Sequence, residues 1–175
     1  MSWGYAIMAF VTLQRLSELV IARRNTARLL AGGAREVGRE HYPVMVALHT
    51  AWLAVLWFTV GGQPISLPLL AVFVVLQLMR VWVLATLGPR WTTRIIVTRD
   101  APLVRRGPFR FVRHPNYMVV TAEIAVLPLT FGLIWVALLF TLLNAAMLTV
   151  RIRAENRALY GNEGVSAQPT PRAGP

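Results

Sequence analysis

The chain has 175 residues, of which 56% are hydrophobic and 14% are charged. An average soluble domain carries about 25% charged residues, so this composition excludes an ordinary water-soluble globule and predicts an integral membrane protein. All 18 basic residues are Arg, and the net charge is +11. In a membrane chain such a charge indicates topology and attraction to anionic lipid rather than a nucleic-acid partner. The absence of Cys excludes disulfides and cysteine-ligated metal, and we expect no metal site.

The apolar segments of the chain predict an all-α fold with five transmembrane helices, because about 20 mostly apolar residues are needed to cross a bilayer. The long apolar stretch at residues 117–150 is enough for two helices that form a hairpin, since Pro128 and Gly132 favour a turn between them. The predicted spans are, in chain order, about residues 3–22, 43–60, 67–87, 115–130 and 132–150.

The distribution of Arg predicts the orientation of these spans. The two short connections, residues 61–66 and 128–132, carry no charge, whereas the longer loops and the segment after the fifth span are basic. The positive-inside rule then places the N-terminus outside and the C-terminus in the cytoplasm. We expect one transmembrane domain over residues 1–161, followed by a disordered tail at residues 162–175, which has little apolar content.

Polar residues recur within the predicted spans at one depth, about 10–15 Å from the cytoplasmic end at 1.5 Å per residue. Polar groups inside a bilayer are expensive and are therefore candidates for function. They indicate either a pocket that opens toward the cytoplasm or hydrogen bonds that hold the helices together. The residues of this polar layer are Gln14, Arg15, His49, Gln77, Arg80, Glu123 and Asn144.

The sharpest local motif is residues 107–117, Gly-Pro-Phe-Arg-Phe-Val-Arg-His-Pro-Asn-Tyr, directly before the fourth span. Pro115 is suited to the first position of a helix, with His114 at the cap. The backbone N–H groups of Asn116, Tyr117 and Met118 would then be free to bind an anion. The alternative interpretation is a simple membrane re-entry turn with aromatic residues at the interface.

A second motif lies where the fifth span leaves the bilayer. Arg151 and Glu155 are four residues apart and share one helix face. They form either an ordinary surface ion pair or a site in which Arg151 grips an anionic substrate while Glu155 accepts hydrogen bonds.

Together these motifs resemble the isoprenylcysteine carboxyl methyltransferase family of membrane enzymes. The resemblance rests on Gly-Pro-Phe-x-x-x-Arg-His-Pro-Asn-Tyr, then an apolar helical hairpin, then Arg-x-x-x-Glu, over about residues 101–161. Residues 40–49 and 91–97 resemble more narrowly the bacterial branch found beside type III polyketide synthases.

The resemblance implies S-adenosylmethionine as the methyl donor. It implies Arg151 and His114 as catalytic residues, with Arg151 facing the substrate. At the cofactor site, Phe109 stands where eukaryotic members have Tyr. From the polar layer, His49, Arg80 and Glu123 are candidate substrate residues. The implied cofactor residues are Leu103, Val104, Phe109, His114, Pro115, Asn116, Tyr117 and Glu155.

The expected acceptor is the carboxylate, or the acidic enol or phenol oxygen, of a lipid-tailed small molecule such as an alkylpyrone or alkylresorcinol. A carboxylate with a pKa near 4 is already ionised and needs no general base, whereas a simple phenol would need help from His41, His49 or His114. The enzyme would lie in the bacterial inner (plasma) membrane, with anionic lipids and the active site at the cytoplasmic face. The alternatives are an NADPH-dependent membrane reductase of the sterol type, whose motif is similar, and a non-catalytic lipid-binding protein.

Overall fold

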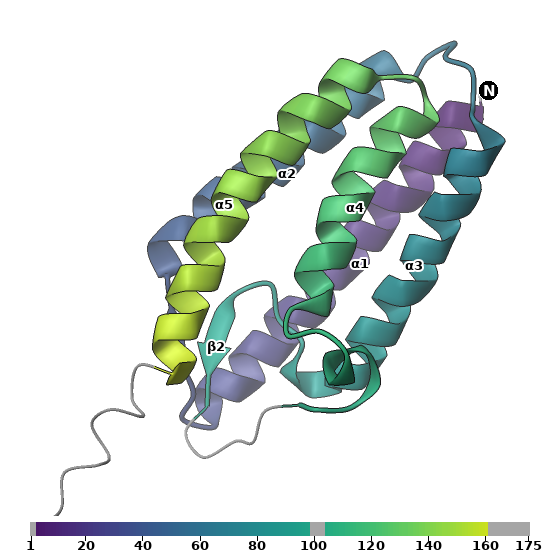
Figure 1. Ribbon diagram of the computed structural model, residues 1–175. Helices are drawn as coiled ribbons and strands as arrows, with labels where there is room; N and C mark the ends of the chain where they lie inside the picture. The colour runs from purple at the N-terminus through teal and green to yellow at the C-terminus, as the bar shows by residue number, and fades with distance from the viewer. Residues whose placement is uncertain (1–2, 99–103, 161–175) are drawn as a thin grey trace, which may run out of the picture.

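The structure is a computed structural model that describes residues 3–98 and 104–160. The predicted tail at residues 162–175 and the candidate Leu103 lie outside the described residues. Within those ranges, five α-helices run side by side, joined at one end by short 3-10 helices and two strands (Figure 1). The α-helices are α1 (Trp3–Ala31), α2 (Tyr42–Thr59), α3 (Leu67–Leu87), α4 (Pro115–Thr130) and α5 (Ile134–Tyr160).

In the part of the chain that the structure describes, four helical segments are long and apolar enough to cross a membrane: Trp3–Ala31, Arg39–Thr59, Leu67–Arg90 and Ile134–Ala158. Their outward side chains are apolar, as for Phe58 and Trp135, which are 88% and 82% exposed. Such a surface is suited to hydrocarbon rather than to water. The protein is therefore an integral membrane protein. Helix α4 has 16 residues, about 24 Å at 1.5 Å per residue, so its crossing of the bilayer stays a prediction.

Helices α1 and α5 extend well beyond the predicted spans, which end at residues 22 and 150. Residues 23–31 and 151–158 are mostly Arg, Ala, Leu and other helix-compatible residues, with no Gly or Pro to end the helix. Each of the two helices therefore has an apolar part followed by a basic, polar part. The extension of α1 places Asn25 on a helix, and the extension of α5 carries Glu155 on the same helix as Arg151, as the sequence predicted.

The turn between α4 and α5 closes on Gly132, which has φ +71°. The Gly132 N–H donates to the Leu129 carbonyl and the Leu133 N–H to the Pro128 carbonyl, both at 3.0 Å. This pattern is a Schellman ending, for which a glycine in the left-handed region is favoured. Pro128 lies inside the last turn of α4, which ends at Thr130, and the chain reverses at residues 131–133.

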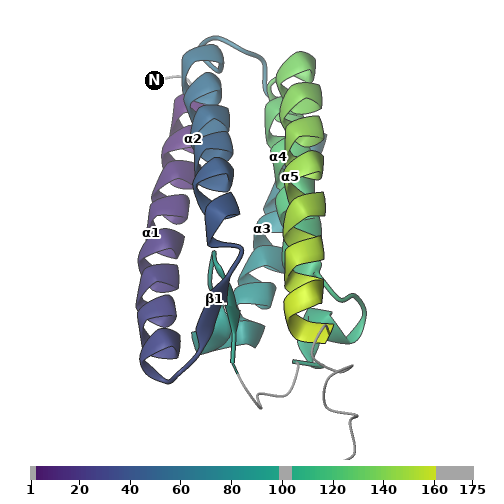
Figure 2. The ribbon, with the colours of Figure 1, turned by 90° about the vertical axis from the view of Figure 1, so that its left-hand side faces the viewer.

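The two ends of the bundle differ in packing. The apolar core lies toward the end that carries the N-terminus and the uncharged connections, and it is built around Trp52, Leu56, Phe73, Leu127 and Phe131. The opposite end carries the basic segments, the short strands and the 3-10 helices (Figure 2). Because the helices are fully packed only at the uncharged end, space between them is available at the basic end.

Two short strands correct the prediction of an all-α fold. Strands β1 (Arg35–Val37) and β2 (Ile95–Val97) pair antiparallel, with Glu36 opposite Ile96. The Arg94 Nη1 donates to both carboxylate oxygens of Glu36 at 2.7 and 2.9 Å, which fastens the loop after α3 to the loop after α1. The sequence did not predict this pairing because each strand has only three residues and the two are far apart in the chain.

Candidate functional site

A cavity of about 1020 Å³ lies at the basic end of the bundle. Its wall includes residues from all five helices and from the segments before and after the undescribed residues 99–103. Pro115 is buried as the first residue of α4, and Glu123 is fully buried and does not line the cavity. The predicted site residues that line it together are His49, Arg80, Val104, Phe109, His114, Asn116, Tyr117, Arg151 and Glu155.

Three of these side chains meet where α4 begins. The Tyr117 hydroxyl donates to Glu155 Oε2 at 2.7 Å, and His114 Nδ1 lies 3.8 Å from the same oxygen. The rings of His114 and Tyr117 stack, with centroids 5.4 Å apart and planes at 19°. Since Glu155 belongs to α5, these contacts join two distant segments and hold a carboxylate at the cavity wall.

The first turn of α4 corrects one expectation from the sequence. His114 is the cap as predicted, and its carbonyl accepts the backbone N–H groups of Tyr117 and Met118 at 3.1 and 3.3 Å. The prediction that these two N–H groups are free to bind an anion is therefore wrong, because the cap carbonyl closes the first turn. Any recognition at this helix start depends on side chains more than on the backbone.

Arg151 is 4% exposed and lies one helical turn before Glu155. Its Nη2 donates to the Thr93 carbonyl at 2.9 Å. Among the residues that the structure describes, Arg151 has no carboxylate within ion-pair distance. The alternative of an ordinary surface ion pair with Glu155 therefore does not hold, and the guanidinium lines the cavity without a described carboxylate as its partner.

Besides the indole nitrogens of Trp52 and Trp91, two buried polar atoms of this wall have no hydrogen-bond partner among the described residues: Asn116 Oδ1 and Arg151 Nε. Leaving such an atom unsatisfied costs about 1–3 kcal/mol, and nearly all buried polar atoms in native proteins are satisfied. One of the two is an acceptor and the other a donor. A polar ligand with both kinds of group would complete them, so this part of the wall is suited to binding one.

Four charged residues form a neutral cluster deeper in the bundle. Arg80 donates through Nε and Nη2 to the two carboxylate oxygens of Glu18 at 2.5 and 2.6 Å, and through Nη1 to Glu123 Oε2 at 3.0 Å. Arg15 donates to Glu18 Oε2 at 3.0 Å and to Glu123 Oε2 at 2.7 Å. We call Arg15, Glu18, Arg80 and Glu123 the charge cluster. It joins α1, α3 and α4.

Some residues of the predicted polar layer line the cavity, and others form hydrogen bonds that hold the helices together. Gln14 and Gln77 do not line the cavity; each donates to a carboxylate of the charge cluster, Glu18 at 3.1 Å and Glu123 at 2.9 Å. The Gln77 bond joins α3 to α4 and is of the packing kind, whereas the Gln14 bond lies within α1. The layer residues that line the cavity are Arg15, His49, Arg80 and Asn144.

The candidate substrate residues Arg80 and Glu123 are occupied by each other and by their neighbours. All three guanidinium nitrogens of Arg80 donate to carboxylates, and Glu123 accepts from Arg15, Gln77 and Arg80. These bonds leave little capacity for a ligand, and they give both residues a role in holding the helices together.

The segment that leads into β2 forms a wall of the cavity that the sequence did not predict. The Thr93 hydroxyl lies 3.1 Å from the Tyr42 hydroxyl, and the Arg94 guanidinium carbon stands 4.3 Å above the Tyr42 ring. Asn25 donates to the Trp91 carbonyl at 2.9 Å. The β-branched run after Arg94 indicates a strand, but only the structure reveals its partner and its place at the cavity.

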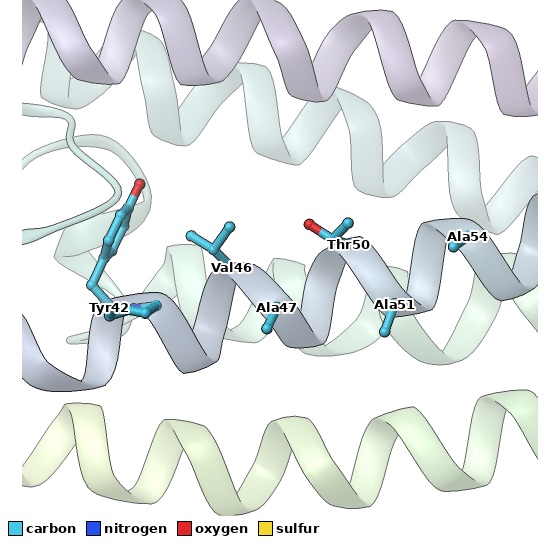
Figure 3. Close-up of a pocket in the computed structure, with 7 residues that line it drawn as sticks. Tyr42, Val46, Ala47, Thr50, Ala51 and Ala54 are labelled. Carbon is cyan, nitrogen blue, oxygen red and sulfur yellow. The ribbon is translucent and has the colours of Figure 1, made fainter.

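A second, open hollow of about 650 Å³ runs along α2 and is apolar apart from Tyr42 and Thr50. Tyr42, Val46 and Thr50 line both this groove and the cavity, so the two adjoin. In Figure 3 these three side chains project from one side of α2, and Ala47 and Ala51 project from the opposite side. Small side chains keep the groove open. The lining residues are Tyr42, Pro43, Val46, Ala47, Thr50, Ala51 and Ala54.

The fold and the cavity define a helical membrane protein built around a ligand site. The model of the Isoprenylcysteine carboxyl methyltransferase (ICMT) family matches residues 69–161, which is more than half of the chain. The chain therefore belongs to the ICMT family, as its motifs predicted, and this membership supports a membrane methyltransferase.

Two bacterial proteins are similar to the chain over most of their length. The uncharacterized protein YpbQ of Bacillus subtilis (strain 168) is 38% identical over 160 residues, which is 89% of this chain and 95% of the relative. An uncharacterized protein of Haemophilus influenzae is 26% identical over 151 residues, 83% of this chain and 88% of the relative. No solved structure matches the chain.

Proposed function

We propose that the protein is an S-adenosylmethionine-dependent O-methyltransferase that acts on a lipid-tailed small molecule. The observation that carries this proposal is the pair of unpartnered buried atoms, Asn116 Oδ1 and Arg151 Nε, in the wall formed by the two family motifs. Membership of the ICMT family supports methyl transfer.

The residues at the start of α4 fit such a donor. Its amino group and ribose hydroxyls are hydrogen-bond donors suited to Asn116 Oδ1 and to the Glu155 carboxylate, which Tyr117 holds in place. Val104 and Phe109 supply apolar wall for its adenine ring and methionine chain. When bound, the group supplies an electrophilic methyl carbon on a positively charged sulfur.

Arg151 is the residue suited to the acceptor. Its charge is buried and unpaired by any described carboxylate, so it would hold an oxyanion at the edge of the donor site. Methyl transfer from a sulfonium requires chiefly that donor and acceptor be positioned in line. In this proposal His114 shapes the donor site through its stacking on Tyr117.

The apolar groove along α2 supports a lipid-tailed acceptor. It adjoins the cavity at Tyr42, Val46 and Thr50, so an acceptor could keep its chain against α2 while its polar head enters the cavity. Carboxylate, enol and phenol heads all fit this arrangement, and alkylpyrones and alkylresorcinols are examples of the last two.

We further propose that the protein lies in the bacterial inner membrane with the cavity at the cytoplasmic face. The Arg-rich segments gather at the end of the bundle that holds the cavity, whereas residues 61–66 and 131–133 at the other end carry no charge. The positive-inside rule supports this orientation, and the same Arg residues would attract anionic headgroups.

Ligand binding in detergent tests the proposal. S-adenosylhomocysteine should raise the unfolding temperature of the purified protein and NADPH should not, and labelled S-adenosylmethionine should transfer its methyl group to a long-chain acceptor. Stabilisation by NADPH alone would instead favour a membrane reductase. Glu155→Gln should weaken S-adenosylhomocysteine binding, and the matched variant Glu40→Gln, which alters an exposed carboxylate away from the cavity, should not.

A further inference from the structure

His49 is the one histidine of α2 that lines the cavity, and its hydrogen bonding fixes which ring nitrogen carries the proton. Its Nδ1 lies 2.8 Å from the Met45 carbonyl oxygen, one turn earlier in the helix. A carbonyl oxygen can only accept a hydrogen bond, so Nδ1 must be the donor. In the neutral ring Nε2 is then left with a lone pair, and it has no hydrogen-bond partner in residues 3–98 and 104–160.

The carboxylates of the cavity wall are already engaged, and the second imidazole, His114, lies at the proposed donor site. Glu18 is held by Arg15 and Arg80 in the charge cluster. Glu155 accepts from Tyr117 and lies beside His114, where the proposed donor site is. Of the described bases in this wall, His49 is the one whose Nδ1 is held by a backbone carbonyl and whose Nε2 is thereby left as a free acceptor away from the proposed donor site.

His49 shares the cavity wall with three guanidinium groups, those of Arg15, Arg80 and Arg151. Arg15 and Arg80 are paired with carboxylates, but Arg151 is not. An acceptor that enters as a neutral hydroxyl must lose a proton and then carries a negative charge. The neutral His49 ring can take the proton, and the Arg151 guanidinium can stabilise the oxyanion.

We propose that His49 is the general base of this enzyme and that the acceptor is a hydroxyl compound, a long-chain phenol or weakly acidic enol, rather than a carboxylate. This inference rests on the proposed methyltransferase function. The O–H bond of the acceptor breaks, the proton passes to Nε2 of His49, and the electron pair stays on the oxygen that is to be methylated. Arg151 stabilises the oxyanion as it forms. The proton later leaves His49 to water at the basic end of the cavity.

A carboxylate acceptor provides the internal comparison, because it is ionised at neutral pH and gains nothing from a base. Two long-chain acceptors, 5-pentadecylresorcinol and tetradecanoate, should therefore respond differently to loss of His49. The test variant is His49→Gln. The matched control is His41→Gln, which changes a histidine that lies outside the cavity wall.

Turnover with labelled S-adenosylmethionine gives the first readout. His49→Gln should lower methylation of the resorcinol by about 10²- to 10⁴-fold, the range for a general base, and should leave S-adenosylhomocysteine affinity unchanged. His41→Gln should alter neither quantity. Wild-type rates of resorcinol methylation by His49→Gln would overturn the proposal. If the wild type and His49→Gln methylated tetradecanoate equally and neither methylated the resorcinol, the general-base proposal would also be overturned, and the proposed methyltransferase function would stay intact.

A second readout needs no donor. The chain has three His, so ¹⁵N-histidine spectra of the wild type and of His49→Gln assign the His49 ring nitrogens directly. We expect a protonated Nδ1 and an unprotonated Nε2, and a shift of the Nε2 signal when 5-pentadecylresorcinol is added. A proton on Nε2 in the free protein, or an Nε2 signal that the resorcinol does not move, would refute the role of His49 even if the protein proved inactive.

Discussion

Glu123 of the charge cluster offers the sharpest test of how this bundle is held together. Its carboxylate accepts hydrogen bonds from Arg15 at 2.7 Å, Gln77 at 2.9 Å and Arg80 at 3.0 Å, and its side chain is 1% exposed. Glu123→Gln preserves the size of the side chain but leaves Arg15 and Arg80 with only Glu18 as counter-ion. Removing one partner of a buried ion pair costs about 3–5 kcal/mol, because the remaining charge is uncompensated.

The second ion pair of similar geometry supplies a matched control. Arg94 donates to both oxygens of Glu36, but the Arg94 side chain is 33% exposed and water can replace the lost partner. Exposed pairs contribute about 0.2–1 kcal/mol. At about 2–4 °C per kcal/mol for a chain of this size, Glu123→Gln should lower the Tm by about 6–20 °C and Glu36→Gln by about 4 °C or less.

Thermal unfolding of the purified protein in detergent, followed by circular dichroism at 222 nm, measures both shifts. Adding Arg15→Gln to Glu123→Gln makes the cluster neutral again and should recover part of the lost Tm. Equal shifts for Glu123→Gln and Glu36→Gln, or no recovery in the double variant, would refute the electrostatic reasoning. If Glu123→Gln instead kept its Tm but lost acceptor binding, Glu123 would be a substrate residue after all.

Three further predictions concern the cavity and its rim. Tyr117→Phe removes the hydrogen bond to Glu155 and should weaken S-adenosylhomocysteine binding about tenfold by calorimetry, a net contribution of roughly 1.5 kcal/mol; unchanged affinity would show that the carboxylate needs no such support. Arg151→Gln should raise the KM of an anionic or oxyanion-forming acceptor by at least about tenfold with donor affinity preserved, and the reverse pattern would place Arg151 at the donor. Gly107→Ala should lower the Tm by several degrees, because Gly107 has φ +56° and the new Cβ would lie 2.5 Å from Thr86 Oγ1; Thr86→Ala in the same chain should recover part of the loss, and no loss at all would contradict the geometry.

The helices were largely predictable from the sequence. Apolar length alone predicts α3 at residues 67–87, and Pro115 correctly predicts where α4 begins. The lengths of α1 and α5 were not predicted, because hydropathy marks where a helix leaves the bilayer and not where it ends. The β1–β2 pairing depends on contacts between residues 35–37 and 95–97, and three-residue segments carry no period that would reveal it.

The sequence predicted which residues belong to the site but not which of them contact one another. The motifs indicated His114, Tyr117 and Glu155, yet only the structure shows that the Tyr117 hydroxyl binds Glu155. Glu18 was missed as a member of the polar layer, although its spacing from Gln14 and Arg15 places all three on one helix face. Buried charges cannot be assigned to a ligand or to each other until the facing helices are known, so the sequence could not predict that Arg80 and Glu123 bind each other.

The shortness of α4 has a consequence for how an acceptor would meet the enzyme. Helices α3 and α4 share one end, where the Ser66 N–H donates to the Thr130 carbonyl at 2.9 Å. Because α4 has 16 residues and α3 has 21, α4 begins about 7 Å short of the other end of α3 at 1.5 Å per residue.

In the proposed orientation, the residues at the start of α4 that would hold the donor are thus recessed toward the hydrocarbon. Pulling a twelve-carbon chain into water would cost about 10 kcal/mol, at 0.8 kcal/mol per CH₂. A recessed site would remove that cost, since the acceptor would need only to diffuse sideways. The quantity that governs turnover would then be the surface density of the acceptor in the membrane, and its solubility in water would not enter the rate.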